Sequence, residues 1–158
     1  LTVSDKGSTG ERADLSGPAL AEALEGKATV LIQDIVPDDL EQIKDKLIAY
    51  TEQGLDLVFT TGGTGFAPRD NTPEATMAVI ERPAPGIVEA IRARSLEITP
   101  FAMLSRAAAG IRGKTLIINF PGSPKAALEC LQVFLPVMNH AVETLRGDAY
   151  ECAQPGAR

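Results

Sequence analysis

The segment from Thr60 to Thr76, TTGGTGFAPRDNTPEAT, carries residue types that bind phosphate and metal ions. Its glycines permit positive φ angles and let a ligand come close to backbone N–H groups, and successive amides in such a turn can form a nest for an anion. From the glycines alone, anion binding and a plain tight turn are equally good interpretations. The segment is not a Walker A loop, because no Gly-Lys-Ser/Thr follows, and it is not GxGxxG.

Asp70 follows these glycines and comes directly before an expected helix. A carboxylate beside phosphate-binding amides is unfavourable unless a cation lies between them. Proteins hold Mg²⁺ with one or two carboxylates together with substrate phosphate oxygens, so Asp70 is a candidate magnesium ligand. An ion pair with Arg69, or stabilisation of the helix N-terminus, fits the residue types equally well.

The elements that must position these residues follow from the apolar pattern. Strands are expected at residues 1–3, 28–36, 55–60 and 115–119, and they alternate with helices at 16–24, 38–53, 72–82, 87–98 and 125–145. Near-continuous apolar strands indicate a parallel sheet with helices on both faces. The predicted fold class is therefore α/β with three layers, in one domain over residues 1–158.

Local signals predict where several of these helices begin. Ser16 and Thr72 are expected helix caps, and Pro73 is favoured in a first turn. Asp38, with Glu41 three residues on, approximates a capping box. Residues 4–13 are expected to form a loop, and Pro136 is expected to kink the last helix.

Ligands of open α/β sheets bind beyond the carboxyl ends of the strands. Four polar loops rich in Gly or Pro follow the expected strands, at residues 4–14, 37–38, 62–71 and 121–125. We expect these loops to meet at one edge of the sheet and to form the site.

Composition excludes several classes of function. The net charge of −6 disfavours general binding of nucleic acid or of anionic membranes, and no apolar run is long enough to span a membrane. Cys130 and Cys152 form no disulfide framework, and no signal peptide is visible, so a cytoplasmic protein is expected.

The chain begins without Met inside an expected strand, so we expect further residues before Leu1. His140, the sole histidine, is expected to have no catalytic role, and the residues from Gln154 are expected to form a frayed tail.

The glycine segment resembles the signature of the molybdopterin-binding family, which includes bacterial MogA/MoaB-type proteins and the G domain of gephyrin. The resemblance covers nearly the whole chain and is closest to the gephyrin-like branch. Asn71 departs from the pattern, because many relatives carry Val there, but the change deletes no functional group. Further segments match the family in order: Thr2–Asp5, Asp14–Pro18, Val36–Asp38, Thr99–Arg106, Gly110–Asn119 and Pro121–Pro124.

This resemblance implies a mostly parallel α/β fold, a homotrimer, and adenylylation of molybdopterin with release of pyrophosphate. ATP and molybdopterin would be the substrates and small-molecule partners, Mg²⁺ the cofactor, and no nucleic acid or membrane would be bound. It implies catalytic roles for Asp70, Asp38 and Asp14, with Asp70 and Asp38 as metal ligands. It implies substrate contacts for Ser4, Asp5, Gly62, Gly63, Thr64, Gly65, Ser105, Arg106, Asn119, Pro121, Gly122 and Ser123.

Blander roles remain open for some of these residues. Asp38 could be a plain helix cap, Asp14 a solvated loop charge, and the Pro121–Ser123 loop a structural turn. For Arg106 the resemblance suggests a more specific role, contact with the terminal phosphate of molybdopterin. The main alternative function is a non-catalytic molybdopterin-binding or scaffold protein, which the three matched aspartates disfavour. A nucleotide hydrolase of the competence-damage-inducible type would carry GGLGPTxDD, where this loop has Arg69-Asp70. A dinucleotide-binding oxidoreductase is disfavoured by the lack of GxGxxG after the first strand.

Overall fold

A computed structural model describes residues 1–148; Cys152 and the expected tail from Gln154 lie outside the described residues. Within them, six strands form one sheet in the order β2-β1-β3-β6-β5-β4. The strands are β1 Thr2–Val3, β2 Ile35–Val36, β3 Leu57–Thr61, β4 Arg82–Pro83, β5 Ala109–Arg112 and β6 Thr115–Phe120. The helices are α1 Asp5–Ser8, α2 Ser16–Ala23, α3 Leu40–Glu52, α4 Thr72–Val79, α5 Pro85–Leu96, the 3₁₀ helix η1 Pro100–Leu104, and α6 Pro124–Arg146.

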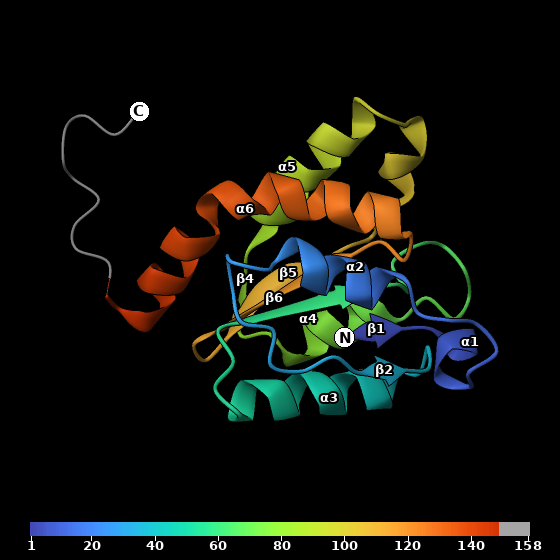
Figure 1. Ribbon diagram of the computed structural model, residues 1–158, viewed down its shortest axis with the longest axis horizontal. Coiled ribbons are helices and arrows are strands. Elements are labelled where there is room, and N and C mark those ends of the chain that lie inside the picture. Colours follow the sequence, from blue (N-terminus) through green and yellow to red (C-terminus); the bar gives the residue numbers. More distant parts are fainter. Residues whose placement is uncertain (149–158) are drawn as a thin grey trace.

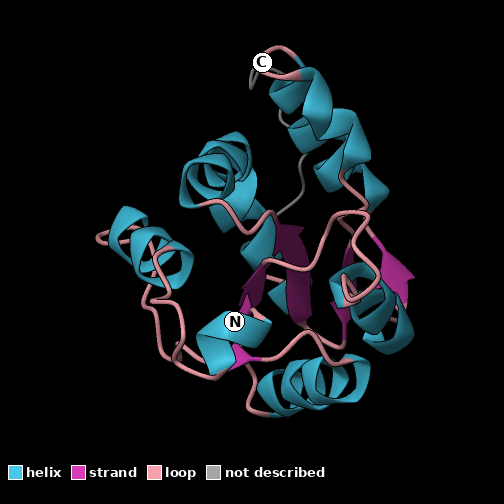
Figure 2. Ribbon diagram, turned by 90° about the vertical axis from the view of Figure 1, so that its right-hand side faces the viewer, coloured by secondary structure: helices cyan, strands magenta, loops and turns pink. Residues whose placement is uncertain are grey.

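The sheet separates two apolar cores, as the predicted three layers require. Helices α3 and α4 cover one face, and α2, α5 and α6 cover the other (Figure 1). Successive side chains of a strand point to opposite faces, so Leu116, Ile118 and Phe120 of β6 pack with the second group, whereas Ile117 packs with the first. The turned view shows the strands enclosed between these helices (Figure 2).

The sheet is mostly parallel, as predicted, but its β4 edge is not. Strands β2, β1, β3 and β6 run parallel, whereas β5 pairs antiparallel with β6 and β4 pairs antiparallel with β5. A tight turn joins β5 to β6, and Gly113 takes a φ of 56° in it. Neither β4 nor β5 was expected from the sequence, because both are short and β5 carries only one large aliphatic side chain, Ile111.

The predicted strand over residues 28–36 is wrong for most of its length. Only Ile35 and Val36 form a strand, pairing with Thr2 and Val3, since the two-residue β1 offers no ladder partner to residues 28–34. Residues 5–8, expected in a loop, form the short helix α1.

Three predicted helix caps are also wrong. Asp39, not Asp38, caps α3, because its side chain accepts the amide proton of Gln42. Asp14, not Ser16, holds the start of α2, as described below. Thr72 is the first residue of α4, and its hydroxyl donates to the carbonyl of Gly62 rather than capping the helix.

The last helix, α6, contains Pro136, and Figure 1 shows the bend expected there. Proline lacks the amide proton that would continue the helical hydrogen bonds, so a bend at this position has a local cause. None of the described helices is long and apolar enough to cross a membrane.

Candidate functional site

The four loops that follow the parallel strands meet at one edge of the sheet, as predicted. The amide of Asp5 donates to Oδ2 of Asp38 (2.9 Å), and the amide of Asp38 donates to Oδ1 of Asp5 (3.0 Å). The guanidinium of Arg69, in the glycine loop, donates twice to the same Asp5 carboxylate (2.6 and 2.8 Å). The fourth loop joins through the hydroxyl of Thr61, which donates to the carbonyl of Pro121 (2.7 Å).

Two glycines at the start of the loop are required by its geometry. Gly62 and Gly63 take φ angles of 103° and 62°, which residues with a Cβ rarely adopt. A Cβ at Gly62 would lie 2.2 Å from the carbonyl oxygen of Val3. A Cβ at Gly63 would lie 2.4 Å from the hydroxyl of Thr72 and 3.0 Å from Oδ1 of Asp38. The chain therefore passes between a strand, a helix and a carboxylate where a larger residue cannot fit.

Backbone groups of the glycine loop divide into bonded carbonyls and free amides. The carbonyls of residues 62 and 63 accept from the hydroxyl and amide of Thr72. The carbonyl of Thr64 accepts from the backbone amide of Arg106, and the carbonyl of Gly65 accepts from Nε of the same residue. In the part of the chain that the structure describes, the amides of residues 63–66 donate no hydrogen bond. Four consecutive free amides can bind an anion.

Asp38 and Asp70 lie beside these amides. Burial raises the pKa of the Asp38 carboxyl, and the negative charges of Asp5 and Asp70 raise it further, although the hydrogen bond from the Asp5 amide opposes the shift. Oδ2 of Asp70 accepts the amide proton of Ala67 (3.0 Å), and it lies 2.9 Å from where a Cβ of Gly65 would be. Arg69 pairs with Asp5, so the alternative in which Asp70 pairs with Arg69 is wrong, whereas stabilisation of the N-terminus of α4 by its charge stays a prediction.

These two carboxylates fit a divalent cation. Oδ1 of Asp38 and Oδ1 of Asp70 accept no hydrogen bond from any described residue, and their mutual repulsion is what a cation between them would relieve. No group of three or more His, Cys, Asp or Glu residues within residues 1–148 is arranged as a metal site. The remaining ligands would therefore be water or phosphate oxygens, as is usual for Mg²⁺.

Asp14 does not join this pair. Its Oδ1 accepts from the amide and hydroxyl of Ser16 (3.0 and 3.1 Å) and the amide of Gly17 (3.1 Å), and its Oδ2 accepts from the hydroxyl of Thr2 (2.7 Å). Burial opposes its charge, but these hydrogen bonds outweigh burial and lower its pKa. The carboxylate is therefore neither a solvated loop charge nor a neighbour of Asp38 and Asp70; it stabilises the start of α2.

Other predicted contact residues have partners within the protein. Ser4 caps α1 by accepting the amide proton of Gly7. Asn119 is 1% exposed; its amide nitrogen donates to the hydroxyls of Thr60 (3.0 Å) and Thr76 (2.8 Å), and its side-chain oxygen accepts from Ala108. Both residues hold the backbone around the site.

The loop after β6 is more open. Gly122 packs against Gly62, so that a Cβ on Gly122 would lie 3.2 Å from the Cα of Gly62. Ser123 precedes α6, and its side chain makes no capping hydrogen bond. The hydroxyl of Ser123 and the first amides of α6 thus remain available to a ligand.

Ser105 and Arg106 approach the glycine loop from the segment between η1 and β5. The hydroxyl of Ser105 accepts from the amide of Ala107 (3.3 Å), and its carbonyl accepts from Arg92 (3.2 Å). The guanidinium of Arg106 donates to the carbonyls of Gly65 (2.7 Å) and Asp70 (2.6 Å) and pairs with Glu74.

Sequence reasoning missed Arg69, Thr72 and Glu74 as parts of the site. Their partners lie 64, 10 and 32 residues away in the sequence, so no local spacing pattern could reveal them. The one available signal was their position inside the same conspicuous segment as Asp70.

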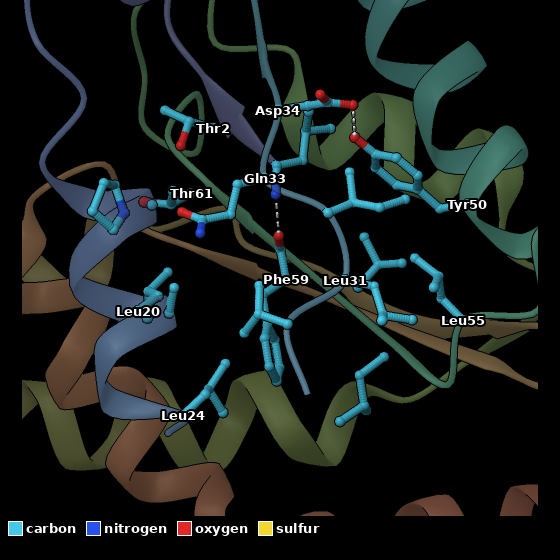
Figure 3. A pocket seen from close by; sticks show the side chains of 18 of the residues that line it. Thr2, Leu20, Leu24, Leu31, Gln33, Asp34, Tyr50, Leu55, Phe59 and Thr61 are labelled. Carbon is cyan, nitrogen blue, oxygen red and sulfur yellow. Dashed lines mark hydrogen bonds between the residues drawn. The ribbon is translucent and has the colours of Figure 1, made fainter. Parts of the chain in front are cut away.

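A cavity of about 320 Å³ lies between α2, β3 and residues 28–35, and Thr2, Asp14 and Thr61 are among the residues that line it (Figure 3). Leu20, Leu24 and Phe59 form apolar walls, and the hydroxyl of Tyr50 donates to Asp34 at one side. The backbone nitrogen of Leu1 donates to the carbonyl of Phe59 at the wall of the cavity. Neither the glycine loop nor Asp38 or Asp70 lines the cavity.

Comparison with known proteins agrees with this architecture. The molybdopterin adenylyltransferase of Helicobacter pylori J99 is 43% identical over 152 residues, which cover 94% of this chain and 86% of that protein. Gephyrin of Dictyostelium discoideum is 42% identical over 90% of this chain, but the chain spans only 21% of gephyrin. The crystal structure of the molybdopterin biosynthesis enzyme MoaB from Thermus thermophilus matches with a TM-score of 0.88 and 48% identity, covering 95% of this chain and 96% of that one.

A protein-family model described as "Probable molybdopterin binding domain" matches residues 1–140. That match extends from β1 into α6 and so includes every loop of the candidate site. The chain therefore belongs to the family of probable molybdopterin binding domains.

Proposed function

We propose that the chain is a molybdopterin adenylyltransferase, which transfers AMP from Mg-ATP to molybdopterin and releases pyrophosphate. The observation that carries the proposal is the arrangement of four amides, at residues 63–66, that donate no hydrogen bond within residues 1–148, beside the carboxylates of Asp38 and Asp70. Amides suit the phosphates of a nucleotide, and a pair of carboxylates suits the cation that accompanies them. The enzymes with this activity among its relatives support the choice of acceptor.

In the proposed reaction the terminal phosphate of molybdopterin attacks the α-phosphorus of ATP, and the bond to pyrophosphate breaks. Such transfers depend chiefly on positioning and on neutralising charge. The loop amides would hold the nucleotide phosphates and stabilise the charge that develops on them. No general base is needed, because a phosphate monoester is already ionised near neutral pH.

Asp38 and Asp70 would hold Mg²⁺, which offsets the repulsion between two anionic reactants. Gly122, Ser123 and the first turn of α6 would contact a further anionic group, because helix N-termini attract negative charge. Asp14, Ser4 and Asn119 would act through the backbone they support. Asp5 would act through Asp38, with which it exchanges backbone hydrogen bonds.

The test is AMP transfer by Asp70→Asn, with purified molybdopterin, Mg-ATP and mass detection of the adduct. We expect an unchanged melting temperature and a loss of kcat/KM on the order of 100-fold or more, as when an electrostatic contact at a reacting group is removed. Asp45→Asn, on the exposed face of α3, is the matched control. Near-normal turnover by Asp70→Asn would remove Asp70 from the mechanism. A wild-type chain that binds molybdopterin but forms no adduct would favour a non-catalytic binding or scaffold protein.

We also propose that residues 1–158 form one domain and assemble as a cytoplasmic homotrimer, as the family resemblance implies. The large exposed apolar side chains of Phe101 (76% exposed) and Met103 (63% exposed) are compatible with burial between copies. Light scattering after size exclusion should give about three times the chain mass of 16.7 kDa. A mass of one chain at micromolar concentration would contradict the trimer.

A further inference from the structure

We infer that Arg106 is a positioning residue: it holds the carbonyl side of the glycine loop so that the loop amides and Asp70 face the substrate, and its guanidinium does not bind phosphate. The inference rests on the proposed function for its consequences in catalysis. It replaces the role suggested by the family resemblance, in which Arg106 meets the terminal phosphate of molybdopterin.

Each nitrogen of the Arg106 guanidinium has one partner within the protein, which accounts for three of its five N–H donors. Nε donates to the carbonyl of Gly65 (2.7 Å), one terminal nitrogen donates to the carbonyl of Asp70 (2.6 Å), and the other pairs with Glu74. The backbone amide of Arg106 also donates to the carbonyl of Thr64 (2.9 Å). Only the second N–H of each terminal nitrogen is left for another acceptor, and the bonds of the other three donors fix the guanidinium on the loop.

These contacts account for the direction of the loop amides. In an extended or turning backbone, the carbonyl and the following amide of one peptide plane point in opposite directions. Fixing the carbonyls of Thr64 and Gly65 on Arg106 therefore turns the amides of Gly65 and Phe66 away from it. Those amides are among the four that donate no hydrogen bond within the described residues.

The same guanidinium also sets the distance between the two halves of the site. Gly65 belongs to the amide half and Asp70 to the carboxylate half, and one side chain bonds the backbone of both. Arg106 is itself held in place, because its neighbours Ser105 and Ala108 are bonded to Arg92 and Asn119. A planar fork is needed for this, since its donors have fixed directions.

The fork requirement gives a test that separates positioning from phosphate binding. Arg106→Lys keeps the positive charge but cannot hold two carbonyls and a carboxylate at once. We expect Arg106→Lys and Arg106→Gln to lose kcat/KM for AMP transfer by a similar factor, on the order of 100-fold, because small misplacements of reacting groups cost that much. A phosphate contact predicts instead that lysine retains activity within a few-fold of wild type.

Two further variants calibrate the measurement. Glu74→Gln should reduce kcat/KM by less than either Arg106 variant, because it weakens one of the three guanidinium contacts. Arg94→Gln is the matched control: Arg94 lies on α5 and pairs with the exposed Glu97, so its loss should leave turnover and its salt dependence unchanged. The salt dependence of KM for molybdopterin should also stay unchanged in the Arg106 variants, whereas loss of a direct contact with its phosphate would flatten it.

A measurement without turnover keeps this inference separate from the proposed function. In the substrate-free protein, NMR signals of residues 63–66 should shift or broaden in Arg106→Lys and stay in place in Arg94→Gln. In the wild-type protein, the Nε–H signal of Arg106 should move little when Mg-ATP or molybdopterin is added. Undisturbed loop signals in Arg106→Lys, or a large ligand-induced shift of Nε–H, would overturn the inference. Absence of AMP transfer by the wild type would overturn only the proposed function.

Discussion

Asp38 and Asp39 are adjacent aspartates with different surroundings. Asp39 caps α3 at the rim of the site by accepting the amide proton of Gln42 (2.9 Å). Asp38 faces inward, where burial and the charges of Asp5 and Asp70 raise its pKa. The positive charge of Arg69 opposes this shift without reversing it, and a carboxyl with a raised pKa in a loop at a sheet edge is a candidate for binding a ligand.

Substitutions at these neighbours should separate catalysis from stability. We expect Asp38→Asn to lower kcat/KM on the order of 100-fold and to raise the Mg²⁺ concentration needed for half-maximal rate, because one of two metal carboxylates is removed. Asp39→Ala should retain turnover but lose about 1 kcal/mol of unfolding free energy, the usual cost of a lost cap. Magnesium titrations and urea unfolding measure the two effects. If Asp38→Asn lowered the free energy of unfolding and left kcat/KM and the Mg²⁺ requirement unchanged, Asp38 would have a structural role alone.

The Asp5–Arg69 ion pair should matter more for the site than for stability. The hydrogen bond from Arg69 lowers the pKa of Asp5, but both side chains are exposed, and exposed ion pairs contribute little to stability. We expect Asp5→Asn and Arg69→Gln each to raise KM for Mg-ATP with little change in melting temperature. Because both act through one contact with the Asp38 loop, the double variant should resemble either single variant. Additive effects would mean that the two residues act separately.

At this scale the sequence predicted the residues whose chemistry is local. The glycines and Asp38 follow strand ends, and Asp70 lies in the loop between β3 and α4; the order of strands alone brings such loops together. Asp14 was grouped with them because it also follows β1, yet its carboxylate turns back to α2. A loop of that length leaves the direction of a side chain undetermined, so only the structure separates Asp14 from the pair.

Elements with a strong apolar period were predicted well, and short ones were not. Helix α3 buries Ile43, Leu47 and Tyr50 at helical spacing, as expected. The segment at 28–36 has β-branched residues but mostly lacks a ladder partner, and strands depend on partners more than on propensity. The β5–β6 hairpin was missed because β5 is short and carries only one large aliphatic side chain, Ile111, although Gly113 marks its turn.

Glycine substitutions should show which turns belong to the site. Gly62 and Gly26 both have positive φ, but a Cβ on Gly26 would meet nothing within 4 Å. Gly26→Ala should therefore lose only the backbone strain, about 1–2 kcal/mol. Gly62→Ala should lose more in urea unfolding, because its Cβ would also strike the backbone of Val3, and it should disturb nucleotide binding. Equal losses would show that the loop moves aside at little cost.

Across the whole molecule, β6 connects the two cores to the site. Its side chains alternate between the core under α3 and α4 and the core under α2, α5 and α6. Asn119, near its end, bonds Thr60 of β3 and Thr76 of α4. The binding edge is thus built on the most buried strand, which gives its loops a rigid base.

Cys130 of α6 lies in the larger core and should make stability fall at alkaline pH. Burial raises the pKa of its thiol from an ordinary 9.0 to about 11, although a hydrogen bond with Ser95 opposes the shift. Between these values the unfolded chain loses the proton and the folded chain keeps it. The thiol's contribution is therefore complete below about pH 9 and is lost as the pH rises toward about 11. Urea unfolding at pH 8 and pH 10.5 should show a loss larger by up to about 2 kcal/mol in wild type than in Cys130→Ala. Other groups that titrate in this range are common to both proteins, so equal losses would mean that the thiol ionises as readily folded as unfolded.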